Sequence, residues 1–331
     1  MRRLRLILVG AGGALLGMLL LVLSGLIDVA SSSRQSGLTD WLWSMAVRQS
    51  VTFRSAGIEV PPLTDPAMIR RGAAHYDLVC AACHGSPTSS PEPFAEGLMP
   101  SPPLLMEQME AWRPPRRIFW TVKHGIRHSA MPAWPTQLRD DEVWAMVAFL
   151  LDMPEMTDDA YAALAGRNAA SLCERCHGDS ASETHGAFPR LNIQSPQYLT
   201  DALRAFRDRT RMSGTMMTAA AGLTDREITA LAETYGRLAT TAAPSSRPGE
   251  DIAFLGIPER KVPPCESCHG PEARPDFPRL GGQERDYILG QLRLFATLGE
   301  ARGGRYVKIM AEAVRGMTEA DMATVADWYG R

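Results

Sequence analysis

Charge of one sign is not in excess in this 331-residue chain: 35 Lys and Arg stand against 37 Asp and Glu, a formal net charge of −2. Without a basic excess the chain lacks the electrostatic footprint of a nucleic-acid-binding protein, and we expect no nucleic-acid partner. Sustained alternation of polar and apolar residues is missing too, which favours a mainly α fold. No Ser/His/Asp set, Gly-rich phosphate loop or carboxylate pair stands out, so no catalytic residues are assigned.

Cysteine is scarce, and its six copies fall into three C-x-x-C-H motifs. Two thiols at this spacing can add to the two vinyl groups of a haem, and the adjacent imidazole is then fixed under the iron. Disulfides within the motifs would close very short loops of little stabilising value. Three pairs cannot combine evenly into four-ligand zinc sites, and a thioredoxin-like motif would need a βαβ context. The sequence therefore predicts three covalently bound haem c groups, held by Cys80, Cys83, His84, Cys173, Cys176, His177, Cys265, Cys268 and His269.

The N-terminus carries a long apolar run. Leu6–Ile27 contains 22 residues without a charge, and as a helix it would span about 33 Å, enough for the bilayer hydrocarbon. Three arginines precede the run and an aspartate follows it, so the positive-inside rule places the rest of the chain outside the cytoplasm. A cleaved signal peptide has a shorter apolar core and a small-x-small cleavage site, which Asp-Val-Ala at 28–30 fits poorly. We expect residues 1–30 to be an uncleaved anchor in a bacterial inner membrane.

The haem motifs resemble those of the class I cytochromes c, and the resemblance covers about residues 66–331. It implies that the N-terminal transmembrane helix is followed by three tandem class I cytochrome c domains, each a small, mainly α unit built around one haem, and the helix itself is expected from the apolar run. A proline after an aspartate cap opens a helix at Pro66 that runs into Cys80. The expected division is 1–30 for the anchor, 31–65 for a periplasmic connecting segment, 66–157 for the first domain, 158–240 for the second, and 241–331 for a linker (Ala239 to Gly249) with the third.

Internal repeats point to the remaining iron ligands. Phe188-Pro-Arg-Leu recurs as Phe277-Pro-Arg-Leu, and each expected domain ends in an amphipathic helix, two of which open with a capping box at Thr224 and Thr318. A methionine stands at the same offset before all three closing helices, 47, 39 and 41 residues after the motif histidines. In the class I family a thioether from a loop opposite the histidine completes the coordination. The resemblance therefore implies the ligand pairs His84 with Met131, His177 with Met216, and His269 with Met310, with Met217 and Met212 as rivals in the second domain.

Other polar residues near the expected haems receive weaker assignments. The four remaining histidines recur at no shared offset and are predicted to be surface or packing residues: His75, His124, His128 and His185. In the family, a proline carbonyl accepts a hydrogen bond from the proximal imidazole. Pro189 and Pro278 match that proline, and Pro102-Pro103-Leu104 is the nearest fit in the first domain. Three arginines shortly before the methionines are expected to be solvated surface charges, with pairing to haem propionates as the alternative: Arg127, Arg211 and Arg305.

Iron held by histidine on one face and methionine on the other has no open position, so it moves single electrons and does not activate oxygen. The second and third domains resemble the tandem two-haem cytochromes. The first resembles single-domain cytochromes and the cytochrome subunits of periplasmic dehydrogenases. The resemblance implies a membrane-anchored carrier, not an enzyme, that takes electrons from a periplasmic dehydrogenase or quinol-oxidising complex and delivers them to a terminal oxidase. The alternatives are a dedicated subunit of a dehydrogenase complex and, if a ligand position is vacant, a haem enzyme such as a peroxidase.

Overall fold

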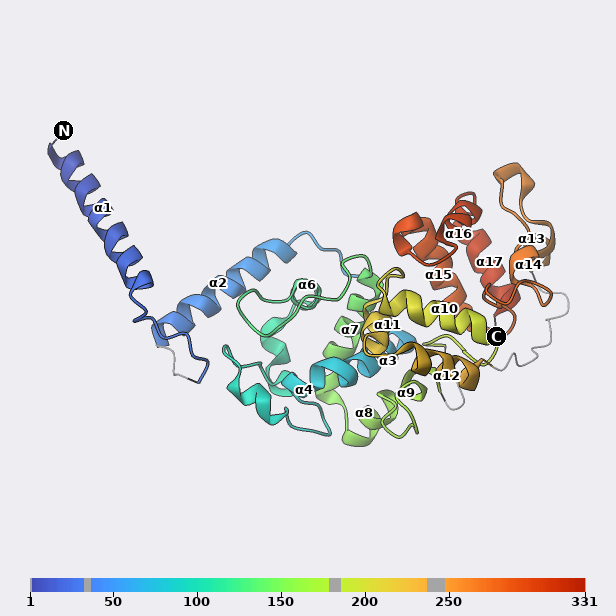
Figure 1. The fold of residues 1–331 in the computed structure, drawn as a ribbon, viewed down its shortest axis with the longest axis horizontal. Helices are drawn as coiled ribbons and strands as arrows, with labels where there is room; N and C mark the ends of the chain where they lie inside the picture. The colour runs from blue at the N-terminus through green and yellow to red at the C-terminus, as the bar shows by residue number, and fades with distance from the viewer. Residues whose placement is uncertain (1, 33–36, 179–185, 237–247, 331) are drawn as a thin grey trace.

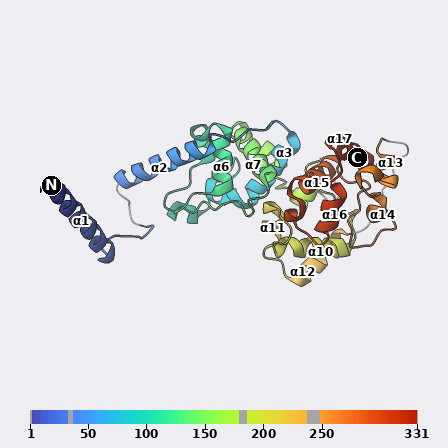
Figure 2. The same ribbon diagram turned by 90° about the horizontal axis from the view of Figure 1, so that it is seen from above.

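The computed structural model describes residues 2–32, 37–178, 186–236 and 248–330, and in these ranges it contains helices and isolated bridges but no strand. The mainly α fold expected from the sequence is therefore confirmed. Figures 1 and 2 show an N-terminal helix standing away from a series of helical units, with the chain's C-terminus at the opposite end of the molecule.

The N-terminal helix α1 spans Arg2–Leu23, so it begins and ends four residues earlier than the predicted apolar run. It ends where Gly25 adopts a left-handed conformation with φ of +73°, the usual way a helix is terminated. None of its residues is buried. The helix is long and apolar enough to cross a membrane, a property that signal sequences share.

The predicted connecting segment contains a helix of its own, α2 (Gly37–Ser55). It packs on α6 (Pro115–His124) and buries Val51 against the first unit. The ring of Trp43 meets the ring of His128 edge-on, with centroids 6.0 Å apart. The segment before the first motif is thus attached to the loop that carries Met131.

The first unit is built on the crossing of α3 (Pro66–His75) and α7 (Asp140–Asp152). As predicted, the Asp65 side chain caps α3 by accepting a hydrogen bond from Ala67 N–H. The helix then continues as a π-helical turn, η1 (Tyr76–Cys80), into α4 (Ala81–His84). Its buried core includes Tyr76, Phe119, Val143, Met146, Phe149 and Tyr161. Tyr161 lies on α8 (Asp158–Leu164), which the sequence assigned to the second unit.

The second and third units repeat one arrangement of short helices. In the second these are α9 (Glu174–His177), α10 (Pro196–Arg207), α11 (Gly214–Ala220) and α12 (Asp225–Tyr235). In the third they are α13 (Glu250–Leu255), α14 (Glu266–His269), α15 (Arg285–Leu298), α16 (Val307–Val314) and α17 (Glu319–Tyr329). The shorter elements are η2 (Pro93–Gly97), α5 (Leu105–Gln108), η3 (Met109–Trp112), η4 (Met153–Glu155), η6 (Pro258–Arg260) and η7 (Gly299–Arg302).

Both predicted capping boxes are confirmed. Thr224 and Glu227 cap α12 reciprocally, and Thr318 and Asp321 do the same for α17. Most of the predicted linker between the second and third units lies outside the described residues.

The crossing of α3 and α7 depends on a residue without a side chain. A Cβ added at Gly72 would lie 2.2 Å from the carbonyl oxygen of Ala145 and 2.6 Å from the Cβ of Phe149. We expect Gly72→Ala to destabilise the haem-loaded first unit by about 1–3 kcal/mol, the usual cost of overpacking. Thermal unfolding of the haem-loaded protein, followed by circular dichroism, measures the change.

Gly290→Ala is the matched control, because Gly290 also lies within a helix but an added Cβ there meets no atom within 4 Å. Alanine at that position should leave the transition unchanged or raise it slightly, since alanine is the better helix former. Equal effects of the two variants would contradict the close helix crossing.

Candidate functional site

Each of the three motif histidines is held by a proline carbonyl. The Nδ1 atoms of His84, His177 and His269 lie 2.9, 2.8 and 2.8 Å from the carbonyl oxygens of Pro103, Pro189 and Pro278 respectively. A carbonyl oxygen can only accept, so Nδ1 carries the proton and Nε2 keeps its lone pair for a metal. The proline role implied by the family resemblance is confirmed in all three units, including the less regular first one.

Burial keeps these imidazoles in the ligand form. It lowers the pKa of His84, His177 and His269, an effect that the hydrogen bond to the proline carbonyl partly opposes. A neutral imidazole with one free nitrogen is the form that binds iron. The surroundings of the three side chains therefore fit an axial ligand.

The six motif cysteines form no disulfide with one another, and each is partly buried. Burial raises the pKa of Cys80 to about 12 and those of Cys176 and Cys265 to about 11, so these thiols stay protonated near neutral pH. Zinc binds thiolates, and in the described ranges no group of three or more His, Cys, Asp and Glu could hold a metal ion. A cysteine pair followed by a proline-held histidine, with no cluster of metal-binding side chains around it in the described ranges, fits covalent attachment of a haem better than a zinc site.

The three aligned methionines are all half-buried, but their backbone settings differ. Met131 lies in a loop, where its N–H donates to Ser129 Oγ at 3.1 Å. Met216 and Met310 lie on the short helices α11 and α16, not in loops as the family resemblance implied. α11 starts before Met216 because Ser213 caps it, accepting from the Met216 N–H at 3.2 Å.

The two rival methionines of the second unit are already engaged in packing. The sulfur of Met212 accepts a hydrogen bond from Thr136 Oγ1 of the first unit at 3.6 Å. Met217 is buried, with 6% of its surface exposed. The contact of Met212 with another unit favours Met216 over it as a ligand.

Of the four other histidines, three lie within the described residues and His185 does not. His75 is buried in α3 against the ring of Trp134, with centroids 4.4 Å apart, and burial lowers its pKa to about 4. His124 and His128 are exposed and stand beside the rings of Trp120 and Trp43. His75 is a packing residue, as the sequence predicted.

One of the three arginines near the methionines is not the solvated charge that we expected. Arg127 and Arg305 are exposed, and Arg305 pairs with Asp201 at 2.6 Å. Arg211, however, is only 9% exposed and donates to the hydroxyls of Tyr198 and Tyr287 at 3.2 and 3.5 Å.

A second buried guanidinium, Arg302, lies beside Arg211, and their mutual repulsion adds to burial in lowering the pKa of Arg302 to about 9. In the part of the chain that the structure describes, neither arginine has a carboxylate partner. Two buried cations without an acid fit the haem-propionate alternative.

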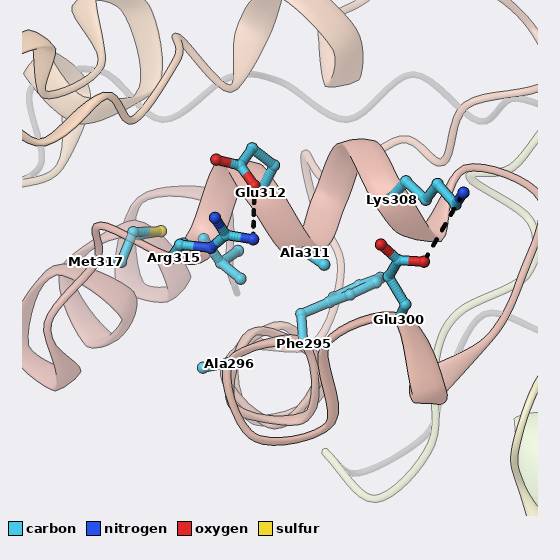
Figure 3. Close-up of a pocket in the computed structure, with 10 residues that line it drawn as sticks. Phe295, Ala296, Glu300, Lys308, Ala311, Glu312, Arg315 and Met317 are labelled. Atoms are coloured by element: carbon cyan, nitrogen blue, oxygen red, sulfur yellow. Dashed lines mark ion pairs between the residues drawn. The ribbon is translucent and has the colours of Figure 1, made fainter.

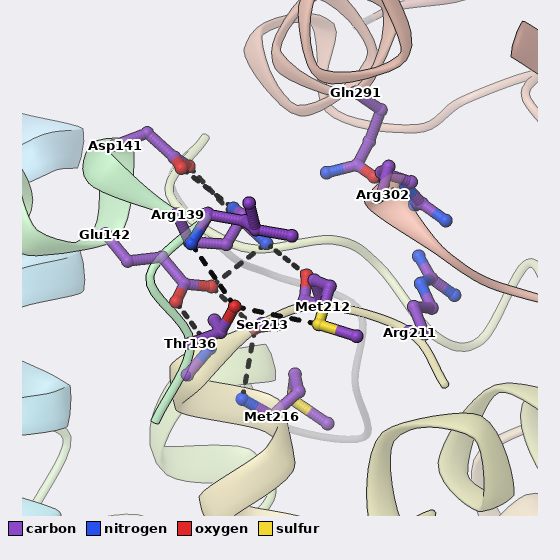
Figure 4. A network of polar contacts seen from close by, with 12 residues as sticks. Thr136, Arg139, Asp141, Glu142, Arg211, Met212, Ser213, Met216, Gln291 and Arg302 are labelled. Carbon is purple, nitrogen blue, oxygen red and sulfur yellow. Dashed lines mark hydrogen bonds and ion pairs between the residues drawn. The ribbon is translucent and has the colours of Figure 1, made fainter. Parts of the chain in front are cut away.

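The first and second units meet beside the segment of the second unit that carries Met212 and Met216 (Figure 4). Glu142, at the start of α7, accepts hydrogen bonds from Ser213 Oγ and Gly214 N–H, each at 2.6 Å. Arg139 donates to the carbonyl oxygen of Met212 at 3.0 Å. There is no room for a side chain at Gly214, since an added Cβ would lie 2.2 Å from Trp134 Nε1.

A second contact joins the two attachment motifs. Arg175, inside the second motif, forms an ion pair with Asp77, which precedes the first motif by three residues. Sequence reasoning missed Glu142 and Asp77, because nothing in the local pattern shows a contact between residues so far apart along the chain.

Two cavities within the described residues have no motif cysteine or histidine in their lining. Figure 3 shows one of about 220 Å³ between α15 and α16, lined by Phe295 and Met317 and bordered by an ion pair of Arg315 with Glu312 at 2.7 Å. A second, of about 490 Å³, lies beside Asp77 and Arg175. Neither is lined by a motif cysteine or histidine, so neither is the candidate site.

Several known proteins are similar to this chain in sequence. A family model described as cytochrome c oxidase, cbb3-type, subunit III matches residues 67–150. The thiosulfate dehydrogenase electron acceptor of Thiomonas intermedia is 36% identical over 170 residues, covering 48% of this chain and 77% of that protein. Cytochrome c4 of Thiocapsa roseopersicina is 30% identical over 169 residues, covering 48% of this chain and 86% of that protein. A solved cytochrome c4 structure from Acidithiobacillus ferrooxidans matches with 28% identity and a TM-score of 0.42, covering 47% of this chain and 96% of that one.

The matched segment makes up most of each of the two curated relatives, one of which is named as an electron acceptor and the other as a cytochrome. The chain belongs to the class I c-type cytochromes and is an electron-transfer protein related to cytochrome c4 and to the electron acceptor of thiosulfate dehydrogenase.

Proposed function

We propose that the chain carries three haem c groups and passes single electrons along them. The observation that carries the proposal is the hydrogen bond from Nδ1 of the motif histidine to a proline carbonyl, which is present once in each of the three units. The cysteines of each motif hold one haem covalently. The axial pairs are His84 with Met131, His177 with Met216, and His269 with Met310.

A bound haem supplies an iron that changes its charge by one without bond breaking. The residues of the chain orient and shield it. The proline carbonyls fix the histidine rings and raise their basicity. The methionines close the opposite face, and Arg211 and Arg302 supply buried positive charge where the second and third units meet. With both axial positions filled, no place is left for a substrate on the metal.

We propose one domain for each haem, preceded by an anchor at 1–30 and a connecting segment at 31–65. The first domain starts at 66, and we extend it past the expected boundary at 157, because Tyr161 and Ala165 pack in its core. The second domain then runs to about 240, and the third, with its linker, to 331. The apolar helix α1 supports membrane attachment with the haem domains on the periplasmic side.

The comparisons favour two kinds of redox partner. The match of residues 67–150 to a cbb3-type oxidase subunit supports delivery of electrons to a terminal oxidase. The similarity to a thiosulfate dehydrogenase electron acceptor supports a periplasmic dehydrogenase as donor, or a dedicated place in such a complex. A quinol-oxidising complex is the other donor that we consider. Co-purification of a dehydrogenase from solubilised membranes would separate a dedicated subunit from a free carrier.

Removal of each methionine tests the axial ligands. In the oxidised protein, Met131→Ala, Met216→Ala and Met310→Ala should each remove about one third of the methionine–iron charge-transfer absorbance, because each variant frees one of the proposed three haems. Met217→Ala is the matched control for Met216, since it removes the neighbouring side chain. Loss of the band from Met217→Ala and not from Met216→Ala would overturn the assignment in the second domain.

Carbon monoxide binding tests whether both axial positions of each proposed haem iron are occupied by side chains. The reduced wild-type protein should show no carbon monoxide spectrum, because both axial positions of each haem are filled. Met131→Ala opens one position and should bind the gas at a single haem, which makes it the positive control. Ready binding by the wild-type protein would instead support a haem enzyme such as a peroxidase.

A further inference from the structure

Two buried glutamines occupy the same place in the repeat. Gln194 and Gln283 each lie six residues after the repeated phenylalanine, at Phe188 and Phe277. Their exposed fractions are 3% and 2%. A buried side-chain amide is costly unless its donor and acceptor are both satisfied, so the partners of these two residues show what they do.

Each glutamine pairs with the backbone of the other unit. Gln283 Oε1 accepts from the N–H of Arg190 at 2.7 Å, and its Nε2 donates to the Arg190 carbonyl at 3.1 Å. Gln194 Oε1 accepts from the N–H of Arg279 at 2.9 Å, and its Nε2 donates to the Arg279 carbonyl at 2.9 Å. The four hydrogen bonds form a reciprocal clasp between the second and third units.

The clasp hydrogen bonds involve the same peptide groups whose carbonyls accept from the motif histidines. The N–H of Arg190 belongs to the same peptide group as the Pro189 carbonyl, and that carbonyl accepts from His177 Nδ1 at 2.8 Å. In the same way, the N–H of Arg279 shares a peptide group with the Pro278 carbonyl that accepts from His269. A hydrogen-bond chain therefore runs from the histidine of one unit to the glutamine of the other.

The first unit lacks this arrangement. His84 is held by the Pro103 carbonyl, and the next N–H in that peptide group belongs to Leu104. Within the described residues, no side-chain amide from another unit bonds to it. The clasp is a property of the repeated pair and not of every proline-held histidine.

We infer that Gln194 and Gln283 are positioning residues that tune the reduction potential of each other's haem across the domain boundary. The inference rests on the proposed haems at His177 and His269. Hydrogen bonds in a chain polarise one another, so a glutamine oxygen on the N–H strengthens the proline carbonyl as an acceptor. A stronger hydrogen bond makes the imidazole more basic, and a more basic ligand favours ferric over ferrous iron. Each glutamine thus lowers the potential of the haem in the opposite unit.

Gln283→Met and Gln194→Met test this in the full-length, haem-loaded protein, because methionine fills similar space without the amide. An NMR redox titration that follows the axial-methionine resonances reports each haem separately. Gln283→Met should raise the reduction potential of the haem at His177 by up to about 59 mV, which is about tenfold in the one-electron equilibrium constant. The potential of the haem at His269 should stay unchanged. Gln194→Met should raise the reduction potential of the haem at His269 and leave that of the haem at His177 unchanged. In each variant the Nδ1–H resonance of the histidine whose haem shifts should also move in the reduced protein.

Gln197→Met is the matched control, because Gln197 is exposed and its amide donates to Asp201 on its own helix, with no bond to the third unit among the described residues. It should shift neither potential.

If a methionine variant does not fold, Gln283→Asn and Gln194→Asn, which shorten the side chain but keep it polar, should give the same crosswise pattern. Equal shifts at both haems, a shift at the haem of the mutated unit, or folded variants with unchanged potentials would each overturn the inference. Absence of haem from the second or third motif in the wild-type protein would instead defeat the proposed function.

Discussion

The hydrogen bond from a motif histidine to a proline carbonyl is the constraint on which the rest of this structure depends. It occurs in all three units, over separations of 19, 12 and 9 residues along the chain. Because the carbonyl can only accept, it sets the tautomer and leaves Nε2 to the metal. The short helices of each unit bring this proline to the histidine that follows the cysteine pair. The first unit achieves it with a longer loop and a different proline context.

The proposed haems would also explain how such small units can be stable. In the second unit one buried apolar cluster consists of Leu199, Ala232 and Tyr235, and further buried apolar side chains, such as Phe206 and Ile228, lie outside it. Apolar groups so small and scattered stabilise a domain poorly, and a covalently held macrocycle would supply further apolar surface. The first unit has a much larger cluster of its own, reaching from Ala73 to Ala165. Loading of the second unit and its folding should therefore be more tightly coupled than in the first.

The sequence predicted what is local or repeated, and it failed where residues meet across units. The Asp65 cap, the capping boxes and the histidine-holding prolines follow from spacing and resemblance, and they are confirmed. The buried state of Arg211 could not be foreseen, because the tyrosines that enclose it come from two units. The same holds for Gln194 and Gln283, whose partners lie 85 to 93 residues away. Their shared offset in the repeat was a signal, but their function appears only when the two units face each other.

The proposed function depends most on the number of covalently bound haems. Intact-mass measurement of the protein, after acidic acetone has removed any haem that is not covalently attached, tests it most directly. We expect the mass of the chain plus three haems, one for each cysteine pair. A chain that retains fewer than three would contradict the assignment of a haem to every motif.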